Sequence, residues 1–221
     1  MSRVLVVAKA PVAGRAKTRL SPAATPDQAA DIAAAALLDT LDAALSTTCG
    51  GVVVAFTGSL ADAARGHELG ALLRRCTVIP QRGNDFPQRL AAAHADTAAR
   101  FPGETVVQIG MDTPQVTPHD LADALARLTD ADAALGFARD GGWWALALRD
   151  PRAARLLRGV ATSRADTGER TWAALRAHGL TVALLDVLSD VDTMVDAVAV
   201  AMSTPGGRFA RAVAEVGLVR S

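Results

Sequence analysis

The chain has 221 residues, half of them hydrophobic, and its 23 Lys and Arg residues balance 23 Asp and Glu residues. This length is sufficient for one large domain with a buried core, and the balanced charge argues against a nucleic-acid or anionic-membrane partner. Cys49 and Cys76 are too few and too far apart for a disulfide framework or a local metal knuckle. Since neither a signal-peptide pattern nor an apolar run of membrane length is visible, we expect a single cytoplasmic domain over residues 1–221.

Seven short apolar runs predict β-strands, and helical segments separate most of them. The runs are Val4–Ala8, Val52–Phe56, Thr77–Pro80, Thr105–Ile109, Ala133–Ala138, Trp143–Leu148 and Thr181–Leu185. Three helices are expected to begin after Thr25, Thr117 and Thr193, because each Thr is followed three residues later by Gln or Asp. This spacing is typical of a capping box. A last helix is expected over Arg208–Val216.

The alternation of strands and helices predicts an α/β fold with three layers (αβα) and a mostly parallel sheet. One connection departs from this pattern. Only four residues, 139–142, join the run Ala133–Ala138 to the run Trp143–Leu148. So short a loop can connect only antiparallel neighbours, so the sheet is expected to be mixed, with one antiparallel hairpin strand.

The first predicted strand leads directly into a loop rich in cations. The loop combines Pro, Gly, Thr and four basic residues: Lys9, Pro11, Gly14, Arg15, Lys17, Thr18 and Arg19. Gly lets backbone N–H groups approach a phosphate, and Lys and Arg supply positive charge. The pattern predicts a phosphate-binding loop, with a solvated surface loop as the alternative. It is not a Walker loop, because Arg15 and Ala16 separate Gly14 from Lys17.

Carboxylates follow two later strands. Asp112 comes directly after the run Thr105–Ile109 and Gly110, and Asp190 and Asp192 follow the run Thr181–Leu185. Ligands of open α/β sheets bind beyond the carboxyl ends of the strands, and oxygen ligands favour Mg²⁺ or Mn²⁺. We therefore expect Asp112 and Asp192 to share one such cation, with Asp190 the less favoured ligand. The alternative is that these residues cap the turns that follow them.

Two further segments are candidates for the same site. In the hairpin, Asp140 precedes Gly141 and Gly142, which would let the backbone approach a ligand, and one of the two Trp residues that follow would stack on a sugar or base. Asp85 and Arg89, after the third strand, would contact the nucleotide or simply form an i,i+4 ion pair. The polar residues 162–164 and 167–169 either line an acceptor pocket or form an ordinary loop.

Taken in order, these motifs resemble a bacterial family of the nucleotide-diphospho-sugar transferase superfamily, generally described as glycosyltransferases. The matching motifs are Lys9-x-Pro11-x-x-Gly14-x-x-Lys17-Thr18-Arg19-Leu20, Gly110-x-Asp112-x-Pro114, Asp140-Gly141-Gly142-Trp143-Trp144 and Asp190-Val191-Asp192-Thr193. The first and last motifs are also similar to those of guanylyltransferases of deazaflavin cofactor biosynthesis. The resemblance implies a GT-A-type fold that binds a nucleotide, with Asp112 on a divalent cation.

The chain departs from this family at positions where the sugar or acceptor would lie. Trp143 stands where Tyr is usual, Ala147 where Gly is usual, and Ala161 where Trp is usual. Phe86-Pro87 replaces a common Leu-Gly pair. These differences bear on the identity of the substrate more than on nucleotide binding.

The motifs and the resemblance together predict a transferase that uses an activated nucleotide and Mg²⁺ or Mn²⁺. Lys17 and Arg19 would neutralise the leaving phosphate with help from Lys9 or Arg15, and Asp140 is the first candidate for a general base. The donor is expected to be a nucleotide sugar, transferred to a small-molecule acceptor. The alternatives are a nucleotidyltransferase that uses a nucleoside triphosphate, and a nucleotide-binding module without catalysis. The oligomeric state is not readable from the sequence.

Overall fold

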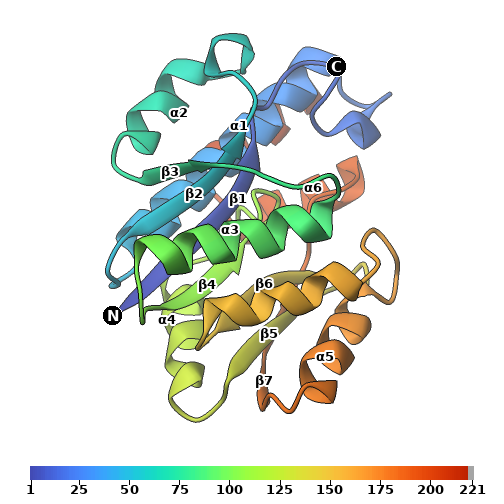
Figure 1. The fold of residues 1–221 in the computed structure, drawn as a ribbon. Coiled ribbons are helices and arrows are strands. Elements are labelled where there is room, and N and C mark those ends of the chain that lie inside the picture. The colour runs from blue at the N-terminus through green and yellow to red at the C-terminus, as the bar shows by residue number, and fades with distance from the viewer. Residues whose placement is uncertain (219–221) are drawn as a thin grey trace.

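The computed structural model describes residues 1–218 and is built on one seven-stranded sheet (Figure 1). The strands are β1 (Ser2–Lys9), β2 (Val52–Thr57), β3 (Thr77–Pro80), β4 (Thr105–Ile109), β5 (Ala133–Ala138), β6 (Trp143–Leu148) and β7 (Val182–Leu188). All seven predicted strands are confirmed. β7 runs three residues further than expected, because polar Asp186 ends the apolar run of the sequence but not the pairing with β5.

The strand order is β3-β2-β1-β4-β6-β5-β7. Neighbouring strands are parallel except at β6, which is antiparallel to both β4 and β5. The mixed, mostly parallel sheet is therefore confirmed, and the four-residue hairpin is the reason for its one reversed strand. Because β6 is reversed, its first residues lie at the same sheet edge as the last residues of β1, β4, β5 and β7.

The α-helices are α1 (Pro26–Ser46), α2 (Gly66–Leu73), α3 (Phe86–Arg100), α4 (Pro118–Ala126), α5 (Thr167–Ala177), α6 (Met194–Ser203) and α7 (Arg208–Leu218). Four of the helices, α1, α4, α6 and α7, begin where the sequence signals place them. Short 3₁₀-helices are η1 (Thr18–Leu20), η2 (Leu60–Asp62), η3 (Arg127–Thr129) and η4 (Pro151–Gly159). Thr25, Thr117 and Thr193 each form a complete capping box, as predicted.

Helices cover both faces of the sheet. Alternate residues of β1 point to opposite sides, so Val4 and Val6 pack with α1, α2 and α4, whereas Leu5 and Val7 pack with α3, η4 and α5. Every one of these four β1 side chains is buried. Burial on both faces explains why the central strand is a continuous apolar run rather than an alternating one.

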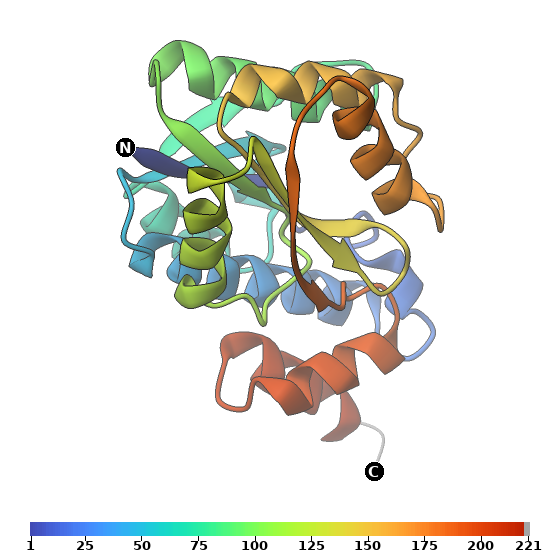
Figure 2. The same ribbon diagram turned by 90° about the horizontal axis from the view of Figure 1, so that it is seen from below.

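The C-terminal helices add a layer that the three-layer prediction did not include. In Figure 2, α6 and α7 lie outside α1, on the side away from the sheet. Phe209 of α7 is buried against Ile32 of α1, and the Arg208 guanidinium bonds to Asp39 at 3.2 Å and Asp42 at 2.6 Å. Ala-rich α1 is consequently buried on two opposite sides, which long side chains would prevent.

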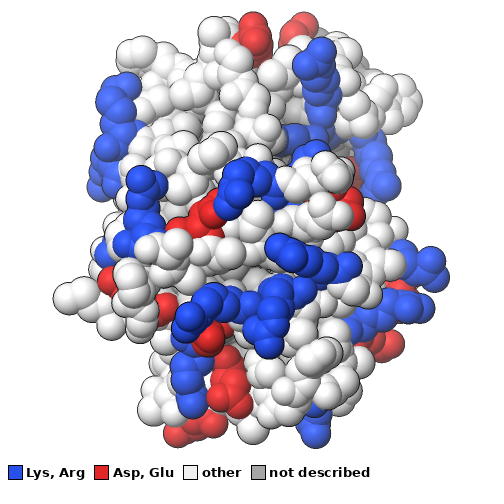
Figure 3. All heavy atoms as spheres, in the orientation of Figure 1, with Lys and Arg blue, Asp and Glu red and all other residues white. Residues whose placement is uncertain are grey.

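The face formed by α3 and η4 carries many basic side chains, with acidic side chains beside several of them (Figure 3). Arg152 pairs with Asp150 at 3.0 Å, and Arg82 pairs with Asp96. Surface pairs of this kind neutralise charge locally and contribute little to stability. Within the described residues, no helix combines the length and the apolar character that crossing a membrane requires.

A buried polar pair lies between α3 and the sheet. His94 of α3 is fully buried, and its Nε2 lies 3.2 Å from Oε1 of Gln108 on β4. Burial lowers the pKa of His94 to about 4, although the bond to Gln108 acts in the opposite direction. His94 is therefore neutral in the folded protein at neutral pH, and its Nδ1 has no hydrogen-bond partner among residues 1–218.

This burial predicts a defined loss of stability in acid. Between pH 6.5 and about 4 the unfolded chain protonates His94 while the folded chain does not, so the free energy of unfolding falls as the pH falls. The loss contributed by His94 reaches at most about 3 kcal/mol near pH 4. Urea denaturation of the wild type and of His94→Leu across this range measures it as the pH dependence of their difference. A difference that stays constant from pH 7 to 4 would contradict the prediction.

Candidate active site

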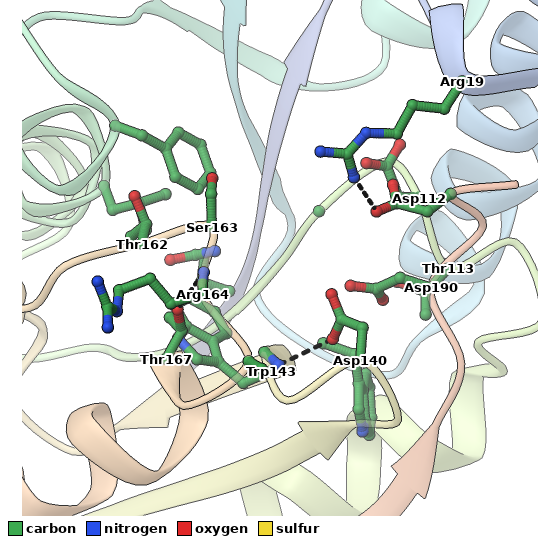
Figure 4. A pocket seen from close by; sticks show the side chains of 18 residues that line it. Arg19, Asp112, Thr113, Asp140, Trp143, Thr162, Ser163, Arg164, Thr167 and Asp190 are labelled. Atoms are coloured by element: carbon green, nitrogen blue, oxygen red, sulfur yellow. Dashed lines mark hydrogen bonds and ion pairs between the residues drawn. The ribbon is translucent and has the colours of Figure 1, made fainter.

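Two adjoining cavities open at the edge of the sheet where the loops after β1, β4 and β7 meet the β5–β6 hairpin. The larger has a volume of about 500 Å³ and is shown in Figure 4; the smaller is about 200 Å³. Both are lined by Arg19, Asp112 and Asp192. Lys9, Arg15, Lys17 and Thr18 line the smaller cavity, so the cationic loop and the predicted carboxylates meet.

Lys17 lies at the centre of this meeting point. Its Nζ is 3.0 Å from Asp112 Oδ1 and 3.9 Å from Asp192 Oδ1, and it also donates to the carbonyl oxygen of Val191. The side chain is only 9% exposed, compared with 73% for that of Arg19. Lys17 has a φ of 47°, a left-handed conformation that is unusual for a residue with a side chain.

Backbone and side-chain bonds fix the carboxylates relative to one another. The Val191 amide donates to the Asp112 carbonyl at 3.0 Å, which joins the loops after β7 and β4. The Arg19 guanidinium pairs with Asp192 Oδ2 at 2.8 Å, and Figure 4 shows this contact beside Asp112. Three segments far apart in the sequence are thus held around one charged point.

The geometry fits a shared cation. One ammonium nitrogen already lies within 4 Å of both Asp112 and Asp192, so one positive charge is within reach of both carboxylates. Among residues 1–218, however, no group of three or more His, Cys, Asp or Glu side chains is arranged to hold a metal by itself. Mg²⁺ typically uses one or two carboxylates and completes its coordination with water and substrate phosphates, which agrees with a pair of ligands.

Asp190 is the carboxylate whose surroundings differ most from water. Burial is the main cause that raises its pKa to about 7, and the charges of Asp112 and Asp140 act in the same direction, against Lys17. It lines the larger cavity, and Figure 4 shows its carboxylate beside that of Asp140. The sequence ranked Asp190 below Asp192 because spacing along a strand does not reveal depth.

The hairpin tip is shaped by packing as well as by the cavity. Asp140 and Gly142 line the larger cavity, and the Gly142 amide donates to Asp140 Oδ1 at 2.8 Å. The space beside Gly141 is filled by protein, because a Cβ there would lie 1.9 Å from the Ala165 carbonyl oxygen. The expectation that Gly141 opens the backbone to a ligand is therefore corrected: its missing side chain lets the hairpin pack against residue 165.

The two tryptophans divide as the strand alternation requires. Trp144 is buried among the residues packed with α1 and α4, and its Nε1 donates to the Asp186 carbonyl at 2.9 Å. Trp143 is half-buried on the other face and lines the larger cavity. Trp143 is accordingly the tryptophan whose ring is available to a ligand.

Four other predicted site residues lie outside the described lining of both cavities: Pro11, Gly14, Asp85 and Arg89. Asp85 caps α3 by accepting the Gln88 amide at 2.8 Å, and Arg89 donates to the Gly83 carbonyl at 3.2 Å. These contacts also replace the expected i,i+4 ion pair between them. The structure thus gives Asp85 and Arg89 local roles at the start of the helix.

The cavity lining also includes residues that the sequence pattern does not assign to the site. The segment 162–165 and Thr167 form one wall of the larger cavity, and the role of this segment in holding an acceptor stays a prediction. Gln108 also lines the floor of this cavity, and the sequence pattern does not predict it as a site residue. Its signal in the sequence is a Gln beside Val106, Val107 and Ile109 in a strand predicted to be buried.

Comparisons with known proteins place these features in a family and a fold. Residues 40–164 match the family described as "Uncharacterized protein conserved in bacteria (DUF2064)". No curated protein matches the chain in sequence.

Solved structures match nearly the whole chain. A Desulfovibrio desulfuricans G20 protein, provisionally assigned as a nucleotide-diphospho-sugar transferase, is 26% identical with a TM-score of 0.83, over 97% of this chain and 95% of that one. CMP:2-keto-3-deoxy-manno-octonic acid synthetase in complex with CTP is 13% identical with a TM-score of 0.53, over 87% and 94%. Rv0371c from Mycobacterium tuberculosis H37Rv, solved with manganese, is 18% identical with a TM-score of 0.51, over 89% and 96%. The chain therefore has a transferase fold of the nucleotide-diphospho-sugar type, which confirms the resemblance read from its motifs.

The packing of the hairpin tip can be tested with two glycines that both have positive φ. Gly103→Ala, at φ 77° with open space around it, should cost only the backbone strain, about 1 kcal/mol. Gly141→Ala, at φ 90°, must also displace the backbone of Ala165 and should cost about 2 kcal/mol more. Thermal or urea unfolding compares the two variants. Equal destabilisation would show that the hairpin does not depend on this contact.

Proposed function

This chain belongs to the bacterial DUF2064 family, and we propose that it is a metal-dependent transferase that uses an activated nucleotide. The observation that carries the proposal is the position of the Lys17 Nζ, which joins Asp112 and Asp192 beside Arg19 in a cavity lined by the cationic loop. Mg²⁺ or Mn²⁺ held by Asp112 and Asp192 would supply charge to neutralise the phosphates of the nucleotide.

The two cavities would bind different parts of the substrates. Lys9, Arg15 and Arg19 line the smaller cavity and would bind the phosphate oxygens there. A charged side chain stabilises a phosphate more strongly in a cavity than in open water. The larger cavity, lined by Asp140 and Trp143, would take the group that is transferred or that accepts. Catalysis then rests on positioning two substrates across the shared carboxylates.

We favour transfer of a sugar from a nucleotide sugar to a small molecule. The Desulfovibrio structure, with its provisional assignment, supports this reading. In this reaction the acceptor hydroxyl attacks the sugar carbon, the nucleoside diphosphate leaves, and Asp140 would receive the proton of the hydroxyl.

The second candidate is nucleotidyl transfer from a nucleoside triphosphate to a phosphorylated small molecule. The dense positive charge of the smaller cavity and the shared fold of the CTP-bound synthetase favour it. Here a phosphate oxygen of the substrate attacks the α-phosphorus and pyrophosphate leaves. Incubation with nucleotide sugars and, separately, with triphosphates plus sugar phosphates distinguishes the two. Release of a nucleoside diphosphate supports the first, and release of pyrophosphate supports the second.

Replacement of a proposed metal ligand tests both reactions. Asp112→Asn should weaken Mn²⁺ binding at least about 100-fold and abolish turnover, since even groups that only orient metal ligands are worth roughly 10–100-fold. Asp123→Asn is the matched control, because Asp123 lies on the exposed surface of α4 and pairs only with Arg127 at 3.3 Å. Calorimetric titration with Mn²⁺ measures both variants.

Unchanged Mn²⁺ affinity in Asp112→Asn would remove this residue from the metal site. Tight binding of nucleotide and Mn²⁺ by the wild type without any turnover would favour a binding module instead of an enzyme.

A further inference from the structure

The floor of the larger cavity is formed by a polar side chain within an apolar strand. Gln108 is the fourth of the five residues of β4 and is 2% exposed. Val106, Val107 and Ile109 around it are buried. A polar group in such surroundings costs free energy unless its hydrogen bonds are made. Gln108 is therefore a position where an apolar residue would fit the strand better.

His94 fixes the orientation of this side chain. Gln108 Oε1 lies 3.2 Å from His94 Nε2, so Oε1 accepts the proton of the neutral imidazole. This tautomer leaves the lone pair of Nδ1 buried with no partner in the described chain. The pair thus carries the cost of one unpaired polar atom, which only apolar residues at both positions would avoid, because a leucine at position 94 alone would leave Gln108 Oε1 without a donor. This cost in stability is expected if the orientation of the Gln108 amide contributes to ligand binding.

The amide nitrogen of Gln108 remains available to the cavity. Within residues 1–218 its Nε2 makes no hydrogen bond. The fully enclosed side-chain atoms without a partner are His94 Nδ1 and Gln115 Oε1, and Gln108 Nε2 is not one of them. Since Gln108 lines the larger cavity, its two N–H donors face that space. The cavity floor therefore offers hydrogen-bond donors that no protein group uses.

The walls of the cavity indicate which ligand oxygen would accept these bonds. The basic residues of the described lining, Arg19 and Arg164, are both paired, with Asp192 at 2.8 Å and Asp166 at 3.2 Å. Asp140 adds negative charge. Unpaired positive charge for an anionic group is thus lacking here, whereas a hydroxyl can both donate to a carboxylate and accept from an amide.

The remaining lining suits a sugar ring. Trp143 presents a half-buried aromatic side chain, and Thr162 and Ser163 add hydroxyl groups on the side of the cavity away from Asp112 and Asp190 (Figure 4). A volume of about 500 Å³ lies within the range of small-molecule pockets, roughly 300–1,000 Å³. Aromatic faces with hydrogen-bonding groups around them match the apolar and hydroxyl faces of a sugar.

We propose that Gln108, held in place by His94, donates a hydrogen bond to a hydroxyl oxygen of an uncharged sugar-like polyol bound in the larger cavity against Trp143. Gln108 is a specificity-determining residue and His94 a positioning residue. This inference rests on the proposed transferase function, because the sugar is either the transferred group of a nucleotide sugar or part of the acceptor.

Binding measurements separate these two sources. Calorimetry with Mn²⁺ and a panel of nucleoside diphosphates first identifies the base that binds. The glucose, mannose and galactose conjugates of that nucleotide then report whether an attached sugar increases affinity. In the second arm, the free sugars are titrated into the protein saturated with diphosphate and Mn²⁺. A gain in the first arm assigns the sugar to the donor, and binding in the second assigns it to the acceptor.

Variants of the pair test the role of Gln108. Gln108→Met, which has similar length but no donor, should lose about tenfold or more of the sugar-dependent affinity and keep the diphosphate affinity within about twofold. His94→Leu should show the same loss, and His94→Gln, which retains an N–H donor, should restore the binding. Thr97→Val is the matched control, since within residues 1–218 the hydroxyl of buried Thr97 bonds only to the Ala93 carbonyl one turn back on α3.

The outcomes distinguish this inference from the function on which it rests. Diphosphate and Mn²⁺ binding without a sugar-dependent gain in either arm overturns the inference and leaves the transferase proposal standing. Full sugar affinity in Gln108→Met also overturns it. Failure of the wild type to bind any nucleotide with Mn²⁺ counts against the transferase proposal itself, and the inference then falls with it.

Discussion

The site depends on one buried ammonium group. Lys17 reaches from the loop after β1 to Asp112 after β4, and to the carbonyl of Val191 and the carboxylate of Asp192 after β7. Without a positive charge at this point, acidic side chains would face one another in a partly buried space, where repulsion is strong. Burial is the main cause that raises the pKa of Asp190, and the charges of Asp112 and Asp140 add to it. The excess of negative charge around Lys17 supports our proposal that a divalent cation and nucleotide phosphates bind at this edge of the sheet.

The topology of the sheet explains why such distant residues meet. β1 and β4 are adjacent and parallel, so the loops that follow them leave the sheet side by side. The reversed β6 brings its first residue, Trp143, to the same edge, and the hairpin adds Asp140. Packing of Gly141 against Ala165 then closes one side of the larger cavity. A single antiparallel strand thus supplies an aromatic wall beside a charged centre.

The two cavities differ in the kind of interaction that they offer a ligand. The smaller one is defined by charge, with Lys17 and its carboxylates in contact. The larger one is defined by orientation, since the buried His94–Gln108 pair fixes a donor at its floor while its arginines are neutralised by aspartates. Ionic groups suit phosphates, and oriented neutral groups suit hydroxyls. This contrast agrees with a transferase that holds a nucleotide on one side and a neutral group on the other.

The sequence by itself determined the strands, the three capping boxes and the mixed sheet, because these follow from local periodicity, turn length and side-chain chemistry. It also singled out Lys17, Arg19, Asp112, Asp140 and Asp192, since charged residues at the ends of apolar runs stand out, and the structure brings them together around the two cavities. Their roles stay predictions. Only the tertiary structure decided depth and direction: that Asp190 is half-buried, that Asp85 and Arg89 serve the start of a helix, and that Gln108 lines a cavity. The outer layer of α6 and α7 likewise became evident only from packing. The burial of a side chain depends on which elements pack against it. Contacts between residues that are distant in the chain cannot be inferred from the local spacing of residue types.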